Sequence, residues 1–395
     1  MEITFLGVVF AVIIVLLAIG RPLYQAIAGG MIVTAGLFHI PVTVIVTKIA
    51  SVIINWSSLS VLLSLYLITF LQRILESRSQ IRLAQQDLNG IFHNRRINTA
   101  GAAFFIGLLP SAASMILCAD IVKDATEGYL DPKEQAFTAS WFRHIPESVL
   151  PTYTAVLLMS NLSGVEISEF IVYMIVPVIA LAGLGYAVYL HRIPNDTGTP
   201  ASTNRLADFA HLIQHLWSLL LILILILVFH FQVVTSVLVS IALCIIIYRV
   251  TLDEIRKFIF AAFEKKMLGN TFLVLCLKEL IAHTGVLLLL PDAMAKLPLP
   301  TYLIFGLLFF TATVISGSTG AIAMGTPLAF AAIPGGAPYL MCMAHAASQI
   351  SPTHVCLVVA ADYFHVTLGD IVKKTLPVSI AFCVLMTLYY NVIKL

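Results

Sequence analysis

Two short polar stretches interrupt long apolar runs in this chain, and they hold residues suited to binding a small solute. The later stretch is Ser351-Pro352-Thr353-His354, and the earlier is Pro151-Thr152, which follows His144 and Glu147. A proline lacks the backbone donor and blocks the helical hydrogen bond to the residue four positions earlier, so each stretch is expected to break a helix. Exposed N–H groups at a break attract anions and exposed carbonyls attract cations. The two breaks therefore predict a binding site.

Two further apolar segments carry small polar residues at their centres, Pro110–Ser114 and Ser316–Gly320. In the second centre, Gly317 and Gly320 allow the backbone to approach a ligand closely, and the hydroxyls of both centres can donate or accept hydrogen bonds. One such hydroxyl alone more often bonds back to its own helix, whereas the whole set favours a site. The predicted substrate-binding residues are Ser111, Ser114, Pro151, Thr152, Ser318, Thr319, Gly320, Ser351, Pro352, Thr353 and His354. A sodium ion near Ser111, Ser114, Ser318 and Thr319 is compatible with these hydroxyls, and no other metal is expected.

Ionisable side chains within apolar segments are costly in a membrane and usually serve function. Asp362 lies deepest in its segment and is the first candidate for ion coupling, followed by Glu147. His354 is suited to contact an anionic substrate or to carry a proton. The remaining coupling candidates are His144, His345 and Asn161, and the two histidines have a structural role at the breaks as an equal alternative.

The amino-acid composition indicates the class of protein in which these residues lie. Of 395 residues, 60% are hydrophobic and 11% are charged, whereas a soluble domain carries about 25% charged residues. The chain is therefore predicted to be an all-α polytopic membrane protein. Its net charge of +2 gives no reason to expect a nucleic-acid partner, and its six cysteines form no Cys-x-x-Cys pair and are predicted to be free thiols.

A spanning helix needs about 20 apolar residues, and the chain divides into about ten such spans and two re-entrant hairpins. The hairpins are expected at about 100–119 and 302–333, an ordinary kinked span being the alternative for the first. The loops at 72–98 and 249–266 are rich in Lys and Arg and so are predicted to be cytoplasmic, which leaves both termini outside. The expected spans are 3–19, 23–48 with a kink at Pro41, 57–71, 135–161, 167–190, 212–231, 233–248, 268–290, 337–364 and 368–390.

The two halves of the chain share a pattern. A shift of 201 positions aligns His144 with His345, Pro151-Thr152 with Pro352-Thr353, and Asn161 with Asp362. Residues 1–190 and 212–395 are thus predicted to form two repeats joined by a cytoplasmic linker at 191–211. Five spans in each half make the repeats inverted relative to one another, and inverted repeats place the substrate at their interface.

These features resemble the ion transporter superfamily, which includes gluconate, citrate and dicarboxylate permeases, and within it an uncharacterised integral membrane family. The resemblance rests on Ser351-Pro352-Thr353-His354, on the Pro151-Thr152 counterpart and on the two polar hairpin centres. It implies a homodimer in a prokaryotic plasma (inner) membrane, with a scaffold domain and a moving transport domain. The dicarboxylate branch carries Ser-Asn-Thr at each hairpin tip, which this chain lacks.

The sequence and the resemblance together predict a secondary active transporter for a small anion, such as an organic carboxylate, that works by alternating access. Na⁺ or H⁺ is the expected coupling ion, and no cofactor is expected. A cation/proton antiporter on the same scaffold is the alternative. An enzyme is not expected, because the chain has no His-Glu-x-x-His, Gly-x-Gly-Asp or Gly-x-Ser-x-Gly motif.

Overall fold

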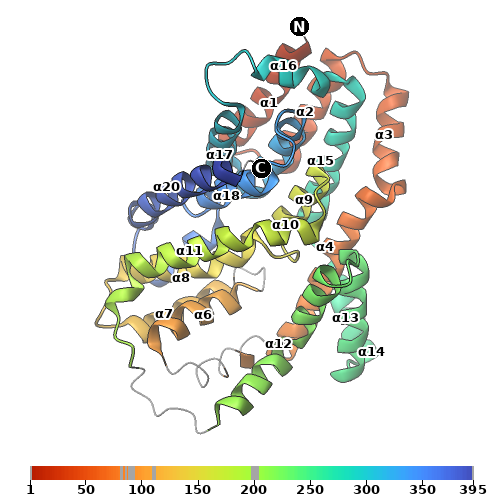
Figure 1. The fold of residues 1–395 in the computed structure, drawn as a ribbon. Helices are drawn as coiled ribbons and strands as arrows, with labels where there is room; N and C mark the ends of the chain where they lie inside the picture. Colours follow the sequence, from red (N-terminus) through yellow and green to blue (C-terminus); the bar gives the residue numbers. More distant parts are fainter. Residues whose placement is uncertain are drawn as a thin grey trace.

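The computed structural model describes residues 2–80, 83–84, 87, 94–108, 113–196 and 204–393, and within them every regular element is a helix (Figure 1). The elements of the first half are α1 Glu2–Ala18, α2 Leu23–Leu37, α3 Val42–Ile54, α4 Trp56–Ser77, α6 Arg95–Ile106, α7 Ala113–Thr126, α8 Pro132–His144, η1 Ile145–Ser148, α9 Thr154–Ser163, α10 Ile167–Tyr173, α11 Ile175–Val188 and η2 Leu190–Arg192. Those of the second half are α12 Arg205–Leu227, α13 Val233–Ile247, α14 Leu252–Ala262, α15 Lys265–Thr284, η3 Val286–Leu289, α16 Leu290–Met294, α17 Thr301–Ala332, α18 Ala337–Ser348, α19 Val355–Tyr363 and α20 Leu368–Ile393.

Five stretches of helix in the described residues are long and apolar enough to cross a bilayer. They are α4, α10 with α11, most of α12, α17 and α20, and they run from 22 to 32 residues. A sixth candidate is α15 with the η3–α16 segment, which is bent by 67° at Gly285. These helices confirm the prediction of a helical membrane protein.

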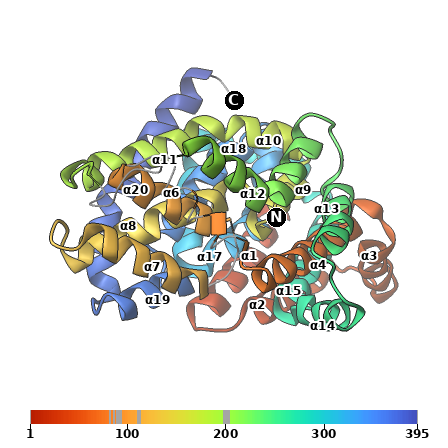
Figure 2. The same ribbon diagram turned by 90° about the horizontal axis from the view of Figure 1, so that it is seen from below.

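The helices pack in two groups that each draw on both halves of the chain. In one group, α4 packs against α3, α13, α14 and α15, α13 packs against α12, and α2 packs against α1 and α15. In the other, α8 packs against α6, α7, α11, α19 and α20, and α18 packs against α17 and α20. Figures 1 and 2 show the first group beside the second, with α17 and α9 lying where the two meet. Contacts of α17 with α1, and of α9 with α4, join the groups.

Three helices are interrupted close to the positions where the sequence predicts breaks. The chain leaves helical geometry between η1 and α9, at Val149–Tyr153, and between α18 and α19, at Gln349–His354. Within α17, Gly317 has φ 77° and ψ 164°, which interrupts the helix at the predicted polar centre. Of the other predicted centre, Pro110–Ser114, residues 110–112 lie outside the described residues, whereas Ser114 lies in the first turn of α7.

Two segments differ from the sequence-based expectation. The expected span at 23–48 is two helices, because α2 ends at Leu37 and α3 starts after Pro41, which has no N–H to continue the first helix. The basic loop at 249–266 contains α14, whose start is fixed by a capping box between Thr251 and Glu254. Both α3 and α14 expose apolar side chains, among them Val42 and Leu252.

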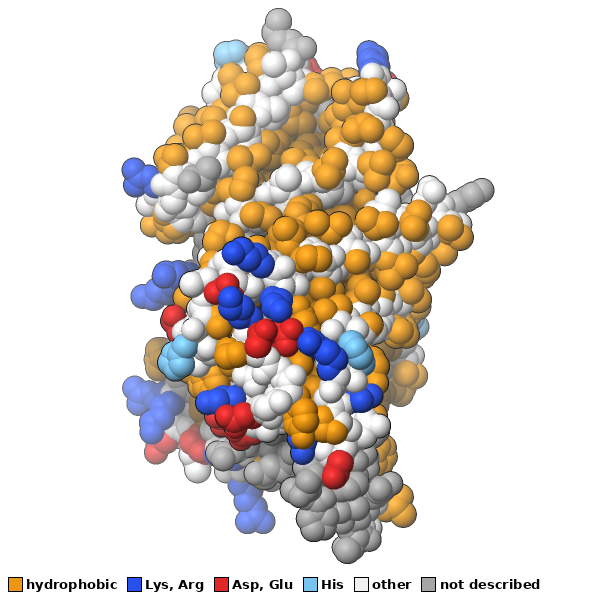
Figure 3. Space-filling view, turned by 90° about the vertical axis from the view of Figure 1, so that its left-hand side faces the viewer, with side chains coloured by type: hydrophobic (Ala, Val, Ile, Leu, Met, Phe, Trp, Pro, Cys, Tyr) orange, Lys and Arg blue, Asp and Glu red, His pale blue; other side chains and the backbone are white. Residues whose placement is uncertain are grey.

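Charged side chains are unevenly distributed on the surface. Figure 3 shows Lys, Arg, Asp and Glu gathered on one part of the face, while hydrophobic side chains cover most of the rest. Ion pairs join the N-terminal ends of α8 and α20: Lys133 Nζ lies 2.8 Å from Asp370 Oδ1, and Lys374 Nζ lies 3.2 Å from Glu134 Oε1. Such a division is typical of a protein whose apolar belt faces lipid.

A bidentate ion pair contributes to the docking of α14 on the end of α4, and we expect this pair to withstand mild acid. Arg78 donates from Nη1 and Nη2 to the two Glu254 oxygens at 2.8 and 3.1 Å. This contact and the Thr251 N–H hold the pKa of Glu254 at about 2. Because the pKa of Glu254 is lower in the folded state than its ordinary value of 4.5, the ionised carboxylate stabilises the folded state above that pH. This stabilisation is lost only as the pH falls through about 2. Glu254→Gln is therefore expected to speed amide exchange of α14 severalfold at pH 7, with Asp253→Asn as the control. Equal exchange in both variants would contradict this role.

Candidate functional site

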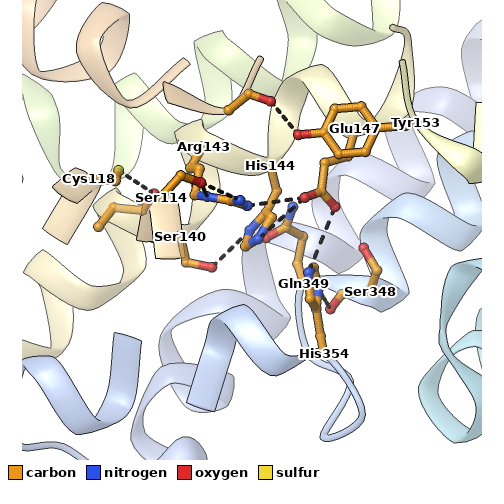
Figure 4. Close-up of polar contacts among 12 residues, drawn as sticks. Ser114, Cys118, Ser140, Arg143, His144, Glu147, Tyr153, Ser348, Gln349 and His354 are labelled. Carbon is orange, nitrogen blue, oxygen red and sulfur yellow. Dashed lines mark hydrogen bonds and ion pairs between the residues drawn. The ribbon is translucent and has the colours of Figure 1, made fainter. Parts of the chain in front are cut away.

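Polar side chains from both halves of the chain converge where the α8–α9 break meets the α18–α19 break. His144 is the last residue of α8, and Glu147 follows in η1, so the turn that interrupts the helix carries both side chains inward. From the second half, His345 lies in the last turn of α18, and His354 is the residue immediately before α19. Figure 4 shows His144, His354 and Glu147 pointing toward one another.

Arg143 is the centre of the polar contacts from the first half. Its side chain is only 1% exposed, and its Nε and Nη2 donate to Ser114 Oγ at 3.2 and 2.8 Å. Its Nη1 donates to Glu147 Oε1 at 3.1 Å. A buried guanidinium paired with a carboxylate and a hydroxyl satisfies the requirement that buried charge be compensated. Arg143 thus fixes the Glu147 carboxylate and attaches the start of α7 to the end of α8.

The histidines pack around the same carboxylate. The ring centroids of His144 and His354 are 4.3 Å apart, and the Nε2 atom of each lies 3.8 Å from a Glu147 oxygen. His345 does not join this stack; its Nε2 is 3.2 Å from Gln349 Nε2 (Figure 4 labels Gln349). The two histidines that the 201-residue shift aligns, His144 and His345, therefore have different neighbours.

A cavity of about 140 Å³ lies between the two breaks and the break in α17. Its lining combines first-half residues, from Glu147 and from Tyr153 to Ala155, with second-half residues that include Ser318, Thr319 and His345. The N-terminal end of α9 borders the cavity, and the residue before it, Tyr153, makes no side-chain capping bond to that helix. Unsatisfied N–H groups at such an end favour a negatively charged ligand.

Several predicted residues support the breaks rather than line this cavity. Ser351 Oγ donates to the Val314 carbonyl at 2.9 Å and so ties the α18–α19 break to the first part of α17. Thr353 is exposed, and its N–H donates to Ser351 Oγ at 3.3 Å. Pro352 is also exposed. Gly320 is buried close to Ser316.

The structure locates the remaining predicted residues elsewhere. Pro151 and Thr152 line a separate apolar cavity of about 180 Å³ that faces α12. Asn161 donates to the Ser57 carbonyl at 2.8 Å, and its amide oxygen lies 3.5 Å from Lys278 Nζ. Asp362, the first candidate for ion coupling, is exposed in the last turn of α19 rather than gathered with Glu147. Ser111 lies outside the described residues, whereas Ser114 bonds to Arg143.

The sequence-based prediction omitted Arg143 and Tyr153. Arg143 is a charge in an apolar segment four residues before Glu147, a spacing at which opposite charges meet on a helix, so it was detectable. Tyr153 carries no comparable signal. Its hydroxyl donates to the carbonyl of Gly107 at the end of α6, which is 46 residues earlier in the sequence.

The fold and the site define a helical membrane protein whose broken helices meet at a buried polar cluster. The chain belongs to the family described as Protein of unknown function (DUF401), which it matches over residues 3–393. Among curated proteins, none matches the chain.

Proposed function

We propose that the protein is a secondary active transporter that carries a small anion by ion-coupled alternating access. The observation that supports this most is the 140 Å³ cavity, which is lined by residues of both broken helices and of the α17 interruption. A cavity of this volume has room for several water molecules, and so for a small solute in their place. A small carboxylate or oxyanion has that size.

Helix ends supply the preference for an anion. The N-terminal end of α9 borders the cavity, and Ser318 and Thr319, also in its lining, open the second part of α17 after Gly317. Each end offers N–H groups without a helical partner and the positive end of a helix dipole. The hydroxyls of Ser318 and Thr319 add donors of hydrogen bonds to an oxyanion.

Coupling to a cation follows from the charge of Glu147. Glu147 lines the cavity, and Arg143 pairs with its Oε1 at 3.1 Å, so an anion that enters beside Oε2 is repelled by the part of the carboxylate charge that Arg143 does not offset. Na⁺ or H⁺ bound near Glu147 offsets that repulsion. Cation and anion then enter and leave together, which is the requirement for symport.

Equal spacing of the elements supports two repeats. α9 begins at Thr154 and α19 at Val355, while α10 begins at Ile167 and α20 at Leu368, and both pairs differ by 201 positions. This shift also aligns His144 with His345. Residues with positive φ recur at matching shifts: Gly164 and His365 at 201, and Gly20 and His230, as well as His39 and Arg249, at 210.

Packing between the halves agrees with this arrangement. α2 and α13, like α3 and α14, begin 210 positions apart. α3 of the first half packs against α15 of the second half. In the same way α14, the counterpart of α3, packs against α4, which occupies the place in the first half that α15 has in the second. We infer ten spans and two re-entrant hairpins in inverted repeats, with the α1–α4 and α12–α16 group as the scaffold. The resemblance to the ion transporter superfamily adds a homodimer, in which the second group moves against the scaffold.

A cation/proton antiporter is the second candidate, and the Glu147 carboxylate between two imidazoles favours it. A pH-sensitive dye inside proteoliposomes separates the two functions. An antiporter changes the internal pH when Na⁺ or K⁺ is added alone, whereas the proposed symporter requires an anion in the medium.

The test of the anion site uses the hydroxyls at the α17 break. Thermal-shift measurements with lactate, succinate, gluconate, phosphate and sulfate identify the bound anion, and its uptake is then measured in proteoliposomes. Ser318→Ala with Thr319→Ala is expected to raise the half-saturating concentration severalfold, because two donors are lost from the cavity.

Ser316→Ala is the matched control, since the Ser316 hydroxyl donates to the Ala312 carbonyl of its own helix at 2.8 Å. The control is expected to transport like the wild type. Unchanged half-saturation in the double variant, or the absence of anion uptake by the wild type, would contradict the proposed site.

A further inference from the structure

Three potential metal ligands lie together beside the cavity, on the breaks of both halves. One ring nitrogen of His144, one of His354 and the Sγ of Cys356 are all within 4.8 Å of one another. His144 ends α8, whereas His354 and Cys356 belong to the start of α19. All three donors are thus brought together by tertiary packing between segments about 210 residues apart in the sequence.

The outer nitrogen of each imidazole is already held by a hydrogen bond. His144 Nδ1 lies 3.1 Å from Ser140 Oγ, and His354 Nδ1 lies 3.0 Å from the Ser348 carbonyl. In metal sites, the non-ligating nitrogen of a histidine makes such a bond, which fixes the ring orientation. These contacts leave both Nε2 atoms directed toward Glu147 (Figure 4).

His144 supplies an independent indication of a ligand. Its side chain is fully buried, and its Nε2 has no hydrogen-bond partner among the described residues. A buried polar atom without a partner is destabilising, so its presence calls for an explanation. Coordination of a metal ion would satisfy it.

Glu147 offers a carboxylate beside these three donors, although it is not among the atoms that lie within 4.8 Å of one another. Its Oε1 is 3.8 Å from His144 Nε2 and its Oε2 is 3.8 Å from His354 Nε2, too long for hydrogen bonds and suited to an ion between them. Arg143 Nη1 holds Oε1 at 3.1 Å and thereby orients the carboxylate, as a second shell does in metal sites.

We propose that His144, His354, Cys356 and Glu147 form a binding site for a borderline-soft divalent transition-metal ion such as Zn²⁺. Two imidazoles, a thiolate and a carboxylate are the ligand types that Zn²⁺ takes in tetrahedral sites. Bond lengths of about 2.0–2.3 Å place the donors of such a site about 3.3–3.6 Å apart, so the two histidines and Cys356 must approach one another by roughly 1 Å, and the Glu147 carboxylate must move in toward them. Both breaks border the cluster and can provide this movement, because neither is held by continuous helical hydrogen bonds.

The bound ion would join the end of α8 to the start of α19. It would therefore restrain the two breaks relative to one another at the cavity they share. The proposed site depends on the donors alone and stands whether or not the protein transports an anion.

Cobalt substitution tests the site through its thiolate ligand. Purified full-length protein is titrated with Co²⁺ alone, and Zn²⁺ is then added as a competitor. We expect one Co²⁺ per chain, a thiolate-to-cobalt charge-transfer absorption and its loss on addition of Zn²⁺. Cys356→Ser is expected to abolish this absorption and to weaken metal affinity at least roughly tenfold.

Cys342→Ser is the matched control, because Cys342 is also a buried free thiol and lies in α18 outside the cluster. It is expected to keep the absorption. His354→Gln, a second variant with a similar side-chain volume, is expected to weaken binding as Cys356→Ser does. Absence of the absorption in the wild type, or its persistence in folded Cys356→Ser protein, would overturn the proposal.

Discussion

Replacing Arg143 with methionine is expected to lower the free energy of unfolding by about 3–5 kcal/mol, the range measured when one partner of a buried ion pair is removed. The variant leaves the Glu147 carboxylate without its donor at 3.1 Å and removes both bonds to Ser114. Steric trapping in lipid bicelles measures the change. No other described contact of Glu147 with a cation is as close, because its histidine contacts are 3.8 Å long.

Two further variants separate this effect from a general loss of charge. Arg192→Met removes an arginine that pairs with Glu134 at 2.8 Å but is 40% exposed, so solvent already screens the interaction and the loss is expected to be much smaller. Adding Glu147→Gln to Arg143→Met is expected to recover part of the lost stability, because the unpaired charge disappears. Equal losses for Arg143→Met and Arg192→Met would refute the structural importance of the buried pair.

Replacing Gly317 with alanine is expected to destabilise the protein by about 1–3 kcal/mol, the strain of a non-glycine residue in a sparsely populated backbone region. Gly317 has φ 77° and ψ 164°, a conformation that a Cβ atom disfavours strongly. An added Cβ would also lie 3.4 Å from Thr353 Oγ1. Relief of the strain requires α17 to become more regular, which would move Ser318 and Thr319 out of the cavity lining.

Gly183→Ala is the control for this variant. Gly183 lies inside α11, and a Cβ built there meets nothing within 4 Å. Alanine in a helix interior is favoured over glycine by about 0.5–1 kcal/mol, so a small gain is expected. Hydrogen exchange at residues 316–320 reports whether the break has closed. A Gly317→Ala variant as stable as the wild type, with unchanged exchange, would show that the backbone at this position is not strained.

Local signals identified much of the architecture. Apolar composition predicted the membrane class, and the small polar centre at Ser316–Gly320 marked the position where α17 breaks. Pro151 and Pro352 marked the other two breaks within a few residues. Such signals are readable because a proline, or a glycine with positive φ, changes the hydrogen bonding of its own helix wherever that helix lies. At Pro41 the same signal was underestimated: the expected kink is a separation into two helices.

Residue types and their order were enough to predict the class of protein, the positions of the breaks and the ionisable groups near them. Which of those groups meet follows from the packing of the helices: Glu147 lies between His144 and His354, whereas Asp362 is exposed. Helix breaks depend on neighbouring residues, whereas contacts between residues some 200 positions apart depend on how whole helices pack. The rotation of one helix by half a turn exchanges a buried side chain for a lipid-facing one, and the residue types alone do not specify that rotation.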